Sequence, residues 1–210
     1  MSFFARAEPK FLLPAENGDI DVMPFLAAAR QLPPFVELLG RTFKPIKYDM
    51  EGNINKLQKV LDKNQNRNFK TLNEMIVADK QNGRSRQDDS ATIALLWLTR
   101  GFRYIVILLE QLIHDHRNGT RSENIVPFCT KAYEESLKMY HRWLFQKMFS
   151  VLIRACPYRR DLLSSMAAGH QCTEEEIMQD VEEFLSVMRP LVDRINAMYE
   201  EEGVAFTDKV

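Results

Sequence analysis

The sequence has few cysteines, and they do not follow a disulfide or zinc-binding pattern. Cys129, Cys156 and Cys172 form an odd number and include no CxxC pair. Small secreted domains depend on a dense, even set of disulfides, whereas cytosolic proteins keep their thiols reduced. The cysteines therefore favour a reducing compartment, and we predict a cytoplasmic protein.

The chain also lacks an excess of charge of either sign. It has 28 basic and 29 acidic residues, a net charge of −1 and a pI near 6.4. Proteins that are drawn to nucleic acid by their overall field carry a marked positive excess. We therefore predict no nucleic-acid partner, although local basic patches remain possible.

No apolar run is long enough and clean enough to predict a membrane span. The strongest run, 91–113, is interrupted by Arg100, Arg103 and Glu110. Each such charge costs about 3 kcal/mol at the centre of a bilayer, so the run predicts a buried helix. The N-terminal residues 1–9 carry charge before a signal-peptide core could form, so no leader is predicted.

Common catalytic and metal-binding motifs are missing as well. The sequence contains no HExxH, no phosphate-binding loop and no nucleophile elbow. His114 and His116 are two residues apart, which places them on different sides of a helix. We predict no enzyme, no cofactor and no metal site. A hydrolase that uses Asp49 and His141 remains an alternative.

Helical periodicity, in contrast, runs through most of the chain, and strand signals are scarce. We predict an all-α protein of about eight helices, with an N-terminal extension at 1–20 and one domain at 21–210. Pro190 predicts a kink or a break in the last helical stretch. The expected helices are 24–30, 35–39, 48–63, 69–78, 90–116, 130–156, 161–168, 173–188 and 192–202.

Asp49, Asn53 and Lys56 form the most informative polar pattern. They are four and three residues apart, so a helix places all three on one face. Aspartate accepts hydrogen bonds, lysine donates them and asparagine does both. The face is either simply solvated or a binding site for a neutral ligand rich in hydroxyl groups.

Two tryptophans and a histidine have comparable double interpretations. Trp97, in a long apolar helix, is either a core residue or a platform for the apolar face of a sugar. His141 is either a satisfied core residue or a neutral ring that bonds an amide carbonyl. Trp143 is either core or a membrane-interface residue, and Arg159 and Arg160 could meet lipid phosphates nearby.

Taken together, the ordered motifs of the chain resemble the glycolipid transfer protein family. The resemblance runs from Phe25-Leu26 to Lys209-Val210, which is nearly the whole chain. The motifs are Leu32-Pro33-Pro34-Phe35, Pro45-Ile46-Lys47-Tyr48-Asp49, Gly52-Asn53-Ile54 with Lys56, Leu96-Trp97-Leu98 with Arg100-Gly101, Lys131-Ala132-Tyr133, Tyr140-His141-Arg142-Trp143 and Ala155-Cys156-Pro157-Tyr158.

The resemblance implies a two-layer sandwich of eight helices that carries glycosphingolipids between membranes without ATP. It implies that Asp49, Asn53 and Lys56 bond the first sugar and that Trp97 stacks on it. It also implies that His141, with Asp49, holds the ceramide amide, and that Trp143 docks on the membrane. The implied hydrocarbon-pocket residues are Phe35, Phe43, Ile46, Tyr133, Leu137, Phe149 and Phe184.

The residues at the headgroup positions distinguish between branches of the family. A related branch that carries ceramide-1-phosphate has lysine in place of Asn53 and arginine in place of Trp97. Because a phosphate needs added positive charge, this chain favours a sugar, as in glucosyl-, galactosyl- or lactosylceramide. Asp208 stands where the family often has a tyrosine that contacts sugar.

We expect a monomer that contacts membranes transiently. Ceramide-1-phosphate-type transfer and glycolipid sensing remain alternatives, as does a helical adaptor that binds a peptide helix in a lipid-sized groove.

Overall fold

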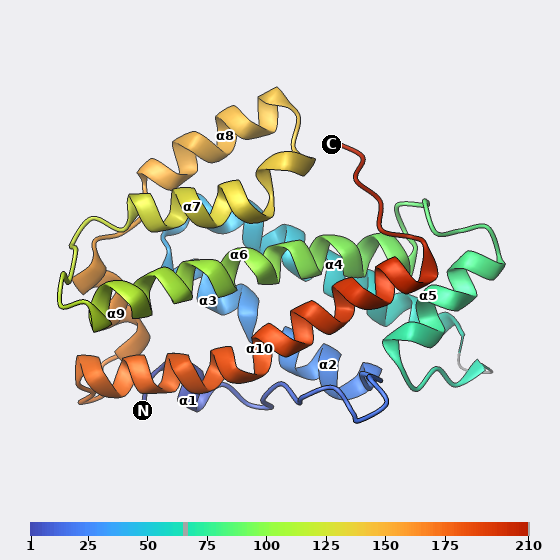
Figure 1. The fold of residues 1–210 in the computed structure, drawn as a ribbon, viewed down its shortest axis with the longest axis horizontal. Coiled ribbons are helices and arrows are strands. Elements are labelled where there is room, and N and C mark those ends of the chain that lie inside the picture. Colours follow the sequence, from blue (N-terminus) through green and yellow to red (C-terminus); the bar gives the residue numbers. More distant parts are fainter. Residues whose placement is uncertain (65–66, 210) are drawn as a thin grey trace.

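The computed structural model describes residues 1–64 and 67–209, and its regular elements are helices (Figure 1). Over these two ranges the only β-type pairings are two isolated bridges, Asp21 with Thr71 and Asn124 with Tyr158. The all-α prediction is therefore confirmed. Val210, at which the family resemblance ends, lies outside the described residues.

The helices begin close to the positions that the sequence predicts. Thr71 and Thr173 open α5 and α10 with capping boxes, in which the threonine and a glutamate three residues later exchange hydrogen bonds. The elements are α1 (Phe3–Arg6), α2 (Val22–Ala29), α3 (Leu32–Leu38), η1 (Arg41–Phe43), α4 (Lys44–Lys63), α5 (Leu72–Gln81), α6 (Ala91–Arg117), α7 (Val126–Ser136), η3 (Lys138–Tyr140), α8 (Trp143–Arg154), α9 (Arg159–Ala167) and α10 (Glu174–Glu202).

Helix α6 is the central element of the fold. It packs against α4, α5, α7 and α10, and Figure 1 shows it crossing in front of α3 and α4. By length and composition α6 could cross a membrane, but 78% of its most apolar window is buried inside the protein. The prediction of a buried helix in this region is confirmed.

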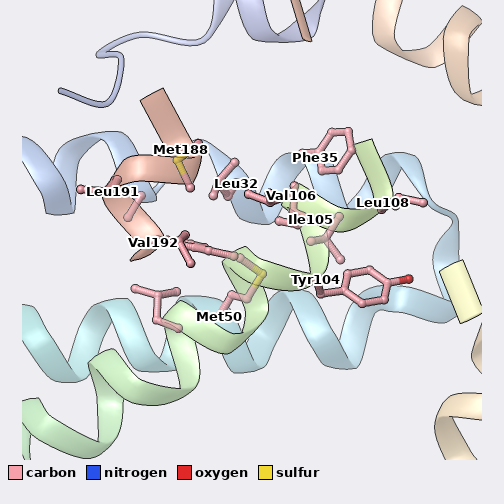
Figure 2. Packing of buried hydrophobic residues seen from close by; sticks show 14 of the residues in the cluster. Leu32, Phe35, Met50, Tyr104, Ile105, Val106, Leu108, Met188, Leu191 and Val192 are labelled. Atoms are coloured by element: carbon pink, nitrogen blue, oxygen red, sulfur yellow. The ribbon is translucent and has the colours of Figure 1, made fainter. Parts of the chain in front are cut away.

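The core is one continuous cluster of buried side chains. Figure 2 shows members of the cluster from α3, α4, α6 and α10, with Leu32, Met50, Val106 and Met188 among them. Burial of a large aliphatic side chain contributes about 1.5–3 kcal/mol to stability, so this cluster holds the two helical layers together.

The predicted single helix 130–156 is wrong. Helix α7 ends at Ser136, η3 follows, and His141 has an extended backbone with φ −99° and ψ 134° before α8 begins at Trp143. The Gln146 side chain donates to the carbonyls of Lys138 (3.0 Å) and His141 (2.8 Å) at the break. The Lys138 carbonyl also accepts from the His141 backbone N–H at 3.3 Å.

Of the kink or break predicted at Pro190, the structure shows the kink: α10 runs without interruption through the proline, so the two expected helices 173–188 and 192–202 are one. Figure 1 shows α10 changing direction near its middle, which is the bend expected where a proline removes one helical hydrogen bond. The buried residues Met188, Leu191 and Val192 hold both halves against the core, so packing outweighs the local cost of the proline.

Candidate functional site

Helix α4 brings Asp49, Asn53 and Lys56 onto one face, as their spacing predicts. Asn53 Nδ2 donates to Asp49 Oδ2 at 3.2 Å. Asn53 is buried and Lys56 is half-buried, whereas the Asp49 side chain remains open to solvent. The bond orients the amide and leaves the second Asp49 oxygen available as an acceptor.

The surroundings of Asp49 make its charged form costly. Desolvation by the neighbouring protein raises the pKa of the Asp49 carboxyl above its usual range, and the charge of Lys56 partly offsets this effect. A ligand whose hydroxyl or amide N–H donates to the carboxylate would stabilise its charged form and so offset the cost of desolvation.

The triad lies in the wall of a cavity of about 420 Å³, which we call the Trp97 cavity. Residues from α4, α6 and α8, together with the segments preceding α6 and α8, contribute to it, so its walls are polar near the triad and apolar elsewhere. It is lined by Pro45, Ile46, Asp49, Met50, Asn53, Lys56, Asp88, Ile93, Trp97, Gly101, Leu137, His141, Phe145, Met148 and Phe149.

Two neighbouring side chains contact the Trp97 ring. Its indole ring stacks on the His141 ring with centroids 5.9 Å apart and planes at 17°. The Arg100 guanidinium lies 4.6 Å from the Trp97 ring centroid and 3.5 Å from that of Tyr140. Arg100 also donates to the Phe206 carbonyl, so the C-terminal segment fixes the cation that supports the indole.

His141 is buried and takes part in a hydrogen bond between its Nδ1 and the Tyr133 hydroxyl at 3.1 Å. Burial, and secondarily the charge of Arg100, lower the pKa of the imidazole. Burial raises the pKa of Tyr133 to about 12, so its hydroxyl keeps its proton. A tyrosine that donates to Nδ1 leaves a neutral ring whose Nε2–H can donate.

The predicted hydrocarbon residues do not all lie in one place. Ile46, Leu137 and Phe149 line the Trp97 cavity, and Tyr133 stacks on Phe149 with ring centroids 4.5 Å apart. Phe35 and Phe43 are completely buried in the core cluster. They line neither the Trp97 cavity nor the second apolar cavity, which is described in the next paragraph.

Phe184 lines a different cavity of about 240 Å³, which we call the N-terminal cavity. Its ring stacks on Phe4 at 4.2 Å, and Phe4 in turn lies 5.0 Å from Phe35. The first residues of the chain therefore pack into the same core as the predicted domain, and the division at residue 21 stays a prediction.

The apolar residues of the Trp97 cavity that are absent from the predicted set include Phe145 and Met148. Their spacing from Phe149, four residues and one, puts all three on neighbouring positions of α8. This spacing could have indicated a shared helix face. The prediction of one helix over 130–156 hid it, because α8 was not recognised as a separate helix.

Helix α8 also carries large apolar side chains into solvent. Trp143 is 65% exposed and Val151 66%, and Leu144 is exposed to a similar degree. Lys147 Nζ lies 4.1 Å from the centre of the Trp143 ring. Figure 1 shows α8 at an outer edge of the molecule, beyond α7, where this apolar surface is accessible.

The interpretation of Arg159 as a lipid-phosphate contact is wrong, because only 2% of its side chain is exposed. Its guanidinium pairs with Asp115 Oδ2 at 3.0 Å and with Glu174 Oε1 at 2.7 Å. These bonds join the end of α6 to the starts of α9 and α10. The neighbouring Arg160 is exposed, with its Nε 3.8 Å from Asp161 Oδ1, and its contact with a lipid surface stays a prediction.

Asp208 lies outside the Trp97 cavity and pairs with Arg86, whose guanidinium also lies over the Phe206 ring. Its carboxylate is therefore engaged by the protein itself. This pairing gives Asp208 a role in holding the C-terminal segment.

The family model described as "Glycolipid transfer protein (GLTP)" matches residues 20–168 of the chain. The chain is 39% identical over 200 residues to the glycolipid transfer protein of Danio rerio, an alignment that covers 94% of this chain and 95% of the relative. It is 36% identical over 189 residues to glycolipid transfer protein B of Xenopus laevis, covering 89% and 90%.

Among solved structures, the fold matches the one described as "How FAPP2 Selects Simple Glycosphingolipids Using the GLTP-fold". The TM-score is 0.87 at 25% identity, and the match covers 100% of both chains. The family model covers most of the chain, and the Danio rerio relative is matched over almost its full length. The chain belongs to the glycolipid transfer protein family.

Proposed function

We propose that this glycolipid transfer protein binds a single glycosphingolipid, with its first sugar in the Trp97 cavity and its ceramide chains in the apolar interior. The observation that carries this proposal is the convergence of Asp49, Asn53, Lys56, Trp97 and His141 on one cavity, although they come from α4, α6 and the η3–α8 connection.

The sugar is recognised by complementary hydrogen-bonding groups. Asp49 accepts from two donors, the Asn53 amide both donates and accepts, and Lys56 donates to a ring or hydroxyl oxygen. Trp97 lies on the α6 side of the same cavity, so the apolar face of the sugar stacks on the indole while its hydroxyls turn to α4.

The ceramide amide is held at the inner end of this site. The Nε2–H of His141 donates to the amide carbonyl, and Asp49 accepts from the amide N–H. Tyr133 supports this arrangement because its hydroxyl bonds the opposite ring nitrogen of His141. One carboxylate thus serves both the sugar and the amide.

The hydrocarbon chains enter past Phe149 and extend into the core. Phe35 connects this region to Phe4 and Phe184, which border the N-terminal cavity. The chains therefore occupy space that side chains fill in this structure, and their entry requires Phe35 and its neighbours to move apart.

Transfer needs no energy source beyond this burial. Each buried methylene contributes about 0.8 kcal/mol, so roughly thirty methylenes correspond to roughly 24 kcal/mol against free water. A protein interior that buries the chains to a similar extent makes exchange with a bilayer nearly thermoneutral. The exposed apolar surface of α8, centred on Trp143, docks a cytoplasmic monomer on the bilayer during exchange.

Trp97→Ala tests the headgroup site. We expect this variant to lose transfer of a fluorescent galactosylceramide between phosphatidylcholine vesicles, because the sugar loses its stacking surface. Trp97→Phe is the matched control and should retain part of the rate. Circular dichroism checks that helicity is unchanged. Full transfer by a folded Trp97→Ala variant would refute the site, and competition by ceramide-1-phosphate would favour the phosphate-type alternative.

A further inference from the structure

One charged side chain of the Trp97 cavity, Asp88, has no role in the function proposed above. It lies in the segment between α5 and α6 and is exposed. Among residues 1–64 and 67–209, no lysine or arginine nitrogen lies within 4.0 Å of its carboxylate. The next residue, Asp89, in contrast pairs with Arg84 at 2.8 Å. Asp88 therefore brings an unpaired negative charge to the cavity wall.

Asp88 and Lys56 lie at the same end of the Trp97 cavity. Figure 1 shows α4 and α6 running in opposite directions, and Met50 of α4 packs against Gly101 of α6 in the cavity wall. Lys56 lies about 9 Å farther along α4 than Met50. Asp88 precedes the first residue of α6, so from Gly101 it lies in the same direction.

The proposed position of the ceramide amide is at the other end. Asp49, which the proposed function assigns to the amide as well as to the first sugar, directly precedes Met50 on α4. His141, the second amide-binding residue, lines the same cavity. A headgroup that is anchored at Asp49 and reaches Lys56 therefore ends beside Asp88.

The charges that line the Trp97 cavity do not balance. They are the carboxylates of Asp49 and Asp88 and the ammonium group of Lys56. The charge of Lys56 lowers the pKa of the Asp49 carboxyl against the larger, opposite effect of desolvation, so these two charges already interact. The carboxylate of Asp88 is left over. A negatively charged ligand group at this end would therefore meet an excess of negative charge.

We propose that Asp88 selects glycosphingolipids with an uncharged headgroup and excludes sulfated ones. The inference rests on the function proposed above, which places the first sugar between α4 and Trp97. The hydroxyl groups of an uncharged sugar donate charge-assisted hydrogen bonds to the Asp88 carboxylate. A sulfate has no hydrogen to donate and carries a negative charge, so it loses these bonds and is repelled. Selection thus combines an attractive and a repulsive element at one residue.

The strength of this selection follows from Coulomb's law. Two like charges about 7 Å apart in water repel each other enough to change an affinity about threefold, and the lower effective dielectric beside a protein increases the effect. Salt screens exposed charges over about 8 Å at physiological ionic strength. The effect of Asp88 is therefore local, and carboxylates elsewhere on the surface contribute little to the choice of lipid.

The test offers the protein two lipids that differ only in one sulfate. Phosphatidylcholine vesicles contain equal amounts of galactosylceramide and its sulfate ester, and the protein is separated from them after equilibration. Native mass spectrometry then gives the ratio of the two bound lipids. We expect the wild type to favour galactosylceramide by at least about threefold, and this preference should weaken in high salt.

Asp88→Asn removes the charge, keeps the size of the side chain and should bring the ratio near one. Asp88→Lys inverts the charge and should reverse the preference. The matched control is Asp193→Asn, which removes the same charge at an exposed residue of α10 outside the Trp97 cavity and should keep the wild-type ratio. Circular dichroism checks that helicity is unchanged. Because the readout is a ratio, a general loss of lipid binding does not imitate the expected result.

Three results would overturn the inference. A wild-type ratio near one would show that Asp88 does not discriminate between the two lipids. A wild-type preference for the sulfated lipid would show that Lys56 outweighs Asp88. A preference for galactosylceramide that both Asp88 variants retain would assign the selection to other residues. Uptake of neither lipid by the folded wild type would instead refute the function proposed above.

Discussion

At the scale of single residues, the protonation of the Asp49 carboxyl makes the hydrogen-bonding capacity of the proposed site depend on pH. Desolvation raises its pKa, and Lys56 opposes the shift without cancelling it. The raised pKa means that the folded protein takes up a proton on Asp49 at a higher pH than the unfolded chain does. The folded protein therefore holds the charged carboxylate less favourably than the unfolded chain does.

We therefore expect glycolipid uptake to weaken as the pH falls through the raised pKa of Asp49, because the protonated carboxyl loses acceptor capacity. Asp49→Asn should bind poorly at every pH. In the wild type, Asp49 lowers the free energy of unfolding as the pH rises from its pKa in the unfolded chain to its pKa in the folded protein. The variant should not show this decrease. Equilibrium urea unfolding at several pH values measures this difference, and an identical pH profile in the variant would contradict the assignment.

Tyr133 carries a separate prediction, because both it and His141 are buried. Tyr133→Phe removes the hydroxyl that bonds His141 Nδ1 and leaves that nitrogen without its partner. We expect a loss of about 1–3 kcal/mol in the free energy of unfolding, together with weaker uptake of ceramide-containing lipids. Denaturant unfolding and native mass spectrometry measure the two effects. Tyr158→Phe, at an exposed residue, is the control and should change neither.

The sequence predicts part of the site at this scale but not all of it. The spacing of Asp49, Asn53 and Lys56 predicts one helix face, and the structure shows it. No spacing in the sequence relates Tyr133 to His141, because their contact depends on the break between α7 and α8. That break has neither a proline nor a glycine to mark it.

At the scale of helices, α8 keeps large apolar side chains in solvent. Its hydrophobic residues divide between the Trp97 cavity, which Phe145 and Phe149 line, and the outer surface, which Trp143 and Val151 occupy. A helix that is apolar around most of its circumference is usually buried. The outer surface of α8 therefore fits an element that is buried only while the protein is docked.

Val151→Asp tests this role of α8. We expect weaker binding to phosphatidylcholine vesicles and slower transfer, because a carboxylate would have to enter the lipid. The free energy of unfolding should change by less than about 0.5 kcal/mol, since Val151 is exposed. Met23→Asp introduces the same charge at an exposed apolar residue of α2 and should leave vesicle binding intact. Equal losses in both variants would contradict docking through α8.

Helix α10 shows where local sequence rules are overridden. Pro190 predicts a kink or a break, and the structure has the kink, since the helix bends but continues. The sequence does contain the information that decides the outcome, because Met188, Leu191 and Val192 follow a helical apolar stripe across the proline. This stripe packs against α6, and the strength of that packing cannot be read from the sequence near the proline alone.

At the scale of the whole molecule, one buried ion network joins three helices whose ends meet far from the Trp97 cavity. Arg159 bonds Asp115 and Glu174, and Glu174 also bonds His116 at 2.8 Å. Burial opposes ionisation of Glu174, but the hydrogen bonds from Arg159 and His116 outweigh it and lower its pKa. The arginine is the cation that keeps Asp115 from being a buried, unpaired charge.

Arg159→Met should therefore lower the free energy of unfolding by about 3–5 kcal/mol, because Asp115 would remain buried without its partner. The neighbouring Arg160→Met is the control. Its side chain is 72% exposed, so its effect should stay within about 0.5 kcal/mol. Denaturant unfolding of both variants measures the difference. A loss for Arg159→Met no larger than for Arg160→Met would show that the network does not stabilise the fold.

The fold as a whole is more predictable than its interior. Helical periodicity predicts most helices, because that signal is local. Phe35 lies outside the walls of both apolar cavities. No local signal predicts this position, because it depends on how the helices of two layers pack. Aromatic residues that the family resemblance assigns to one pocket thus occupy separate places in this structure.

The bond from Arg100 to the Phe206 carbonyl joins the C-terminal segment to the guanidinium that contacts the Trp97 ring. Figure 1 shows this C-terminal segment running back toward the connection between α7 and α8. A fluorescent protein or affinity tag fused after the last residue would pull on the backbone that anchors the guanidinium under Trp97. Biosensors and purification schemes for this protein should therefore leave the carboxyl end unmodified, since a fusion there would disturb the contact between Arg100 and Trp97 beside the proposed sugar site.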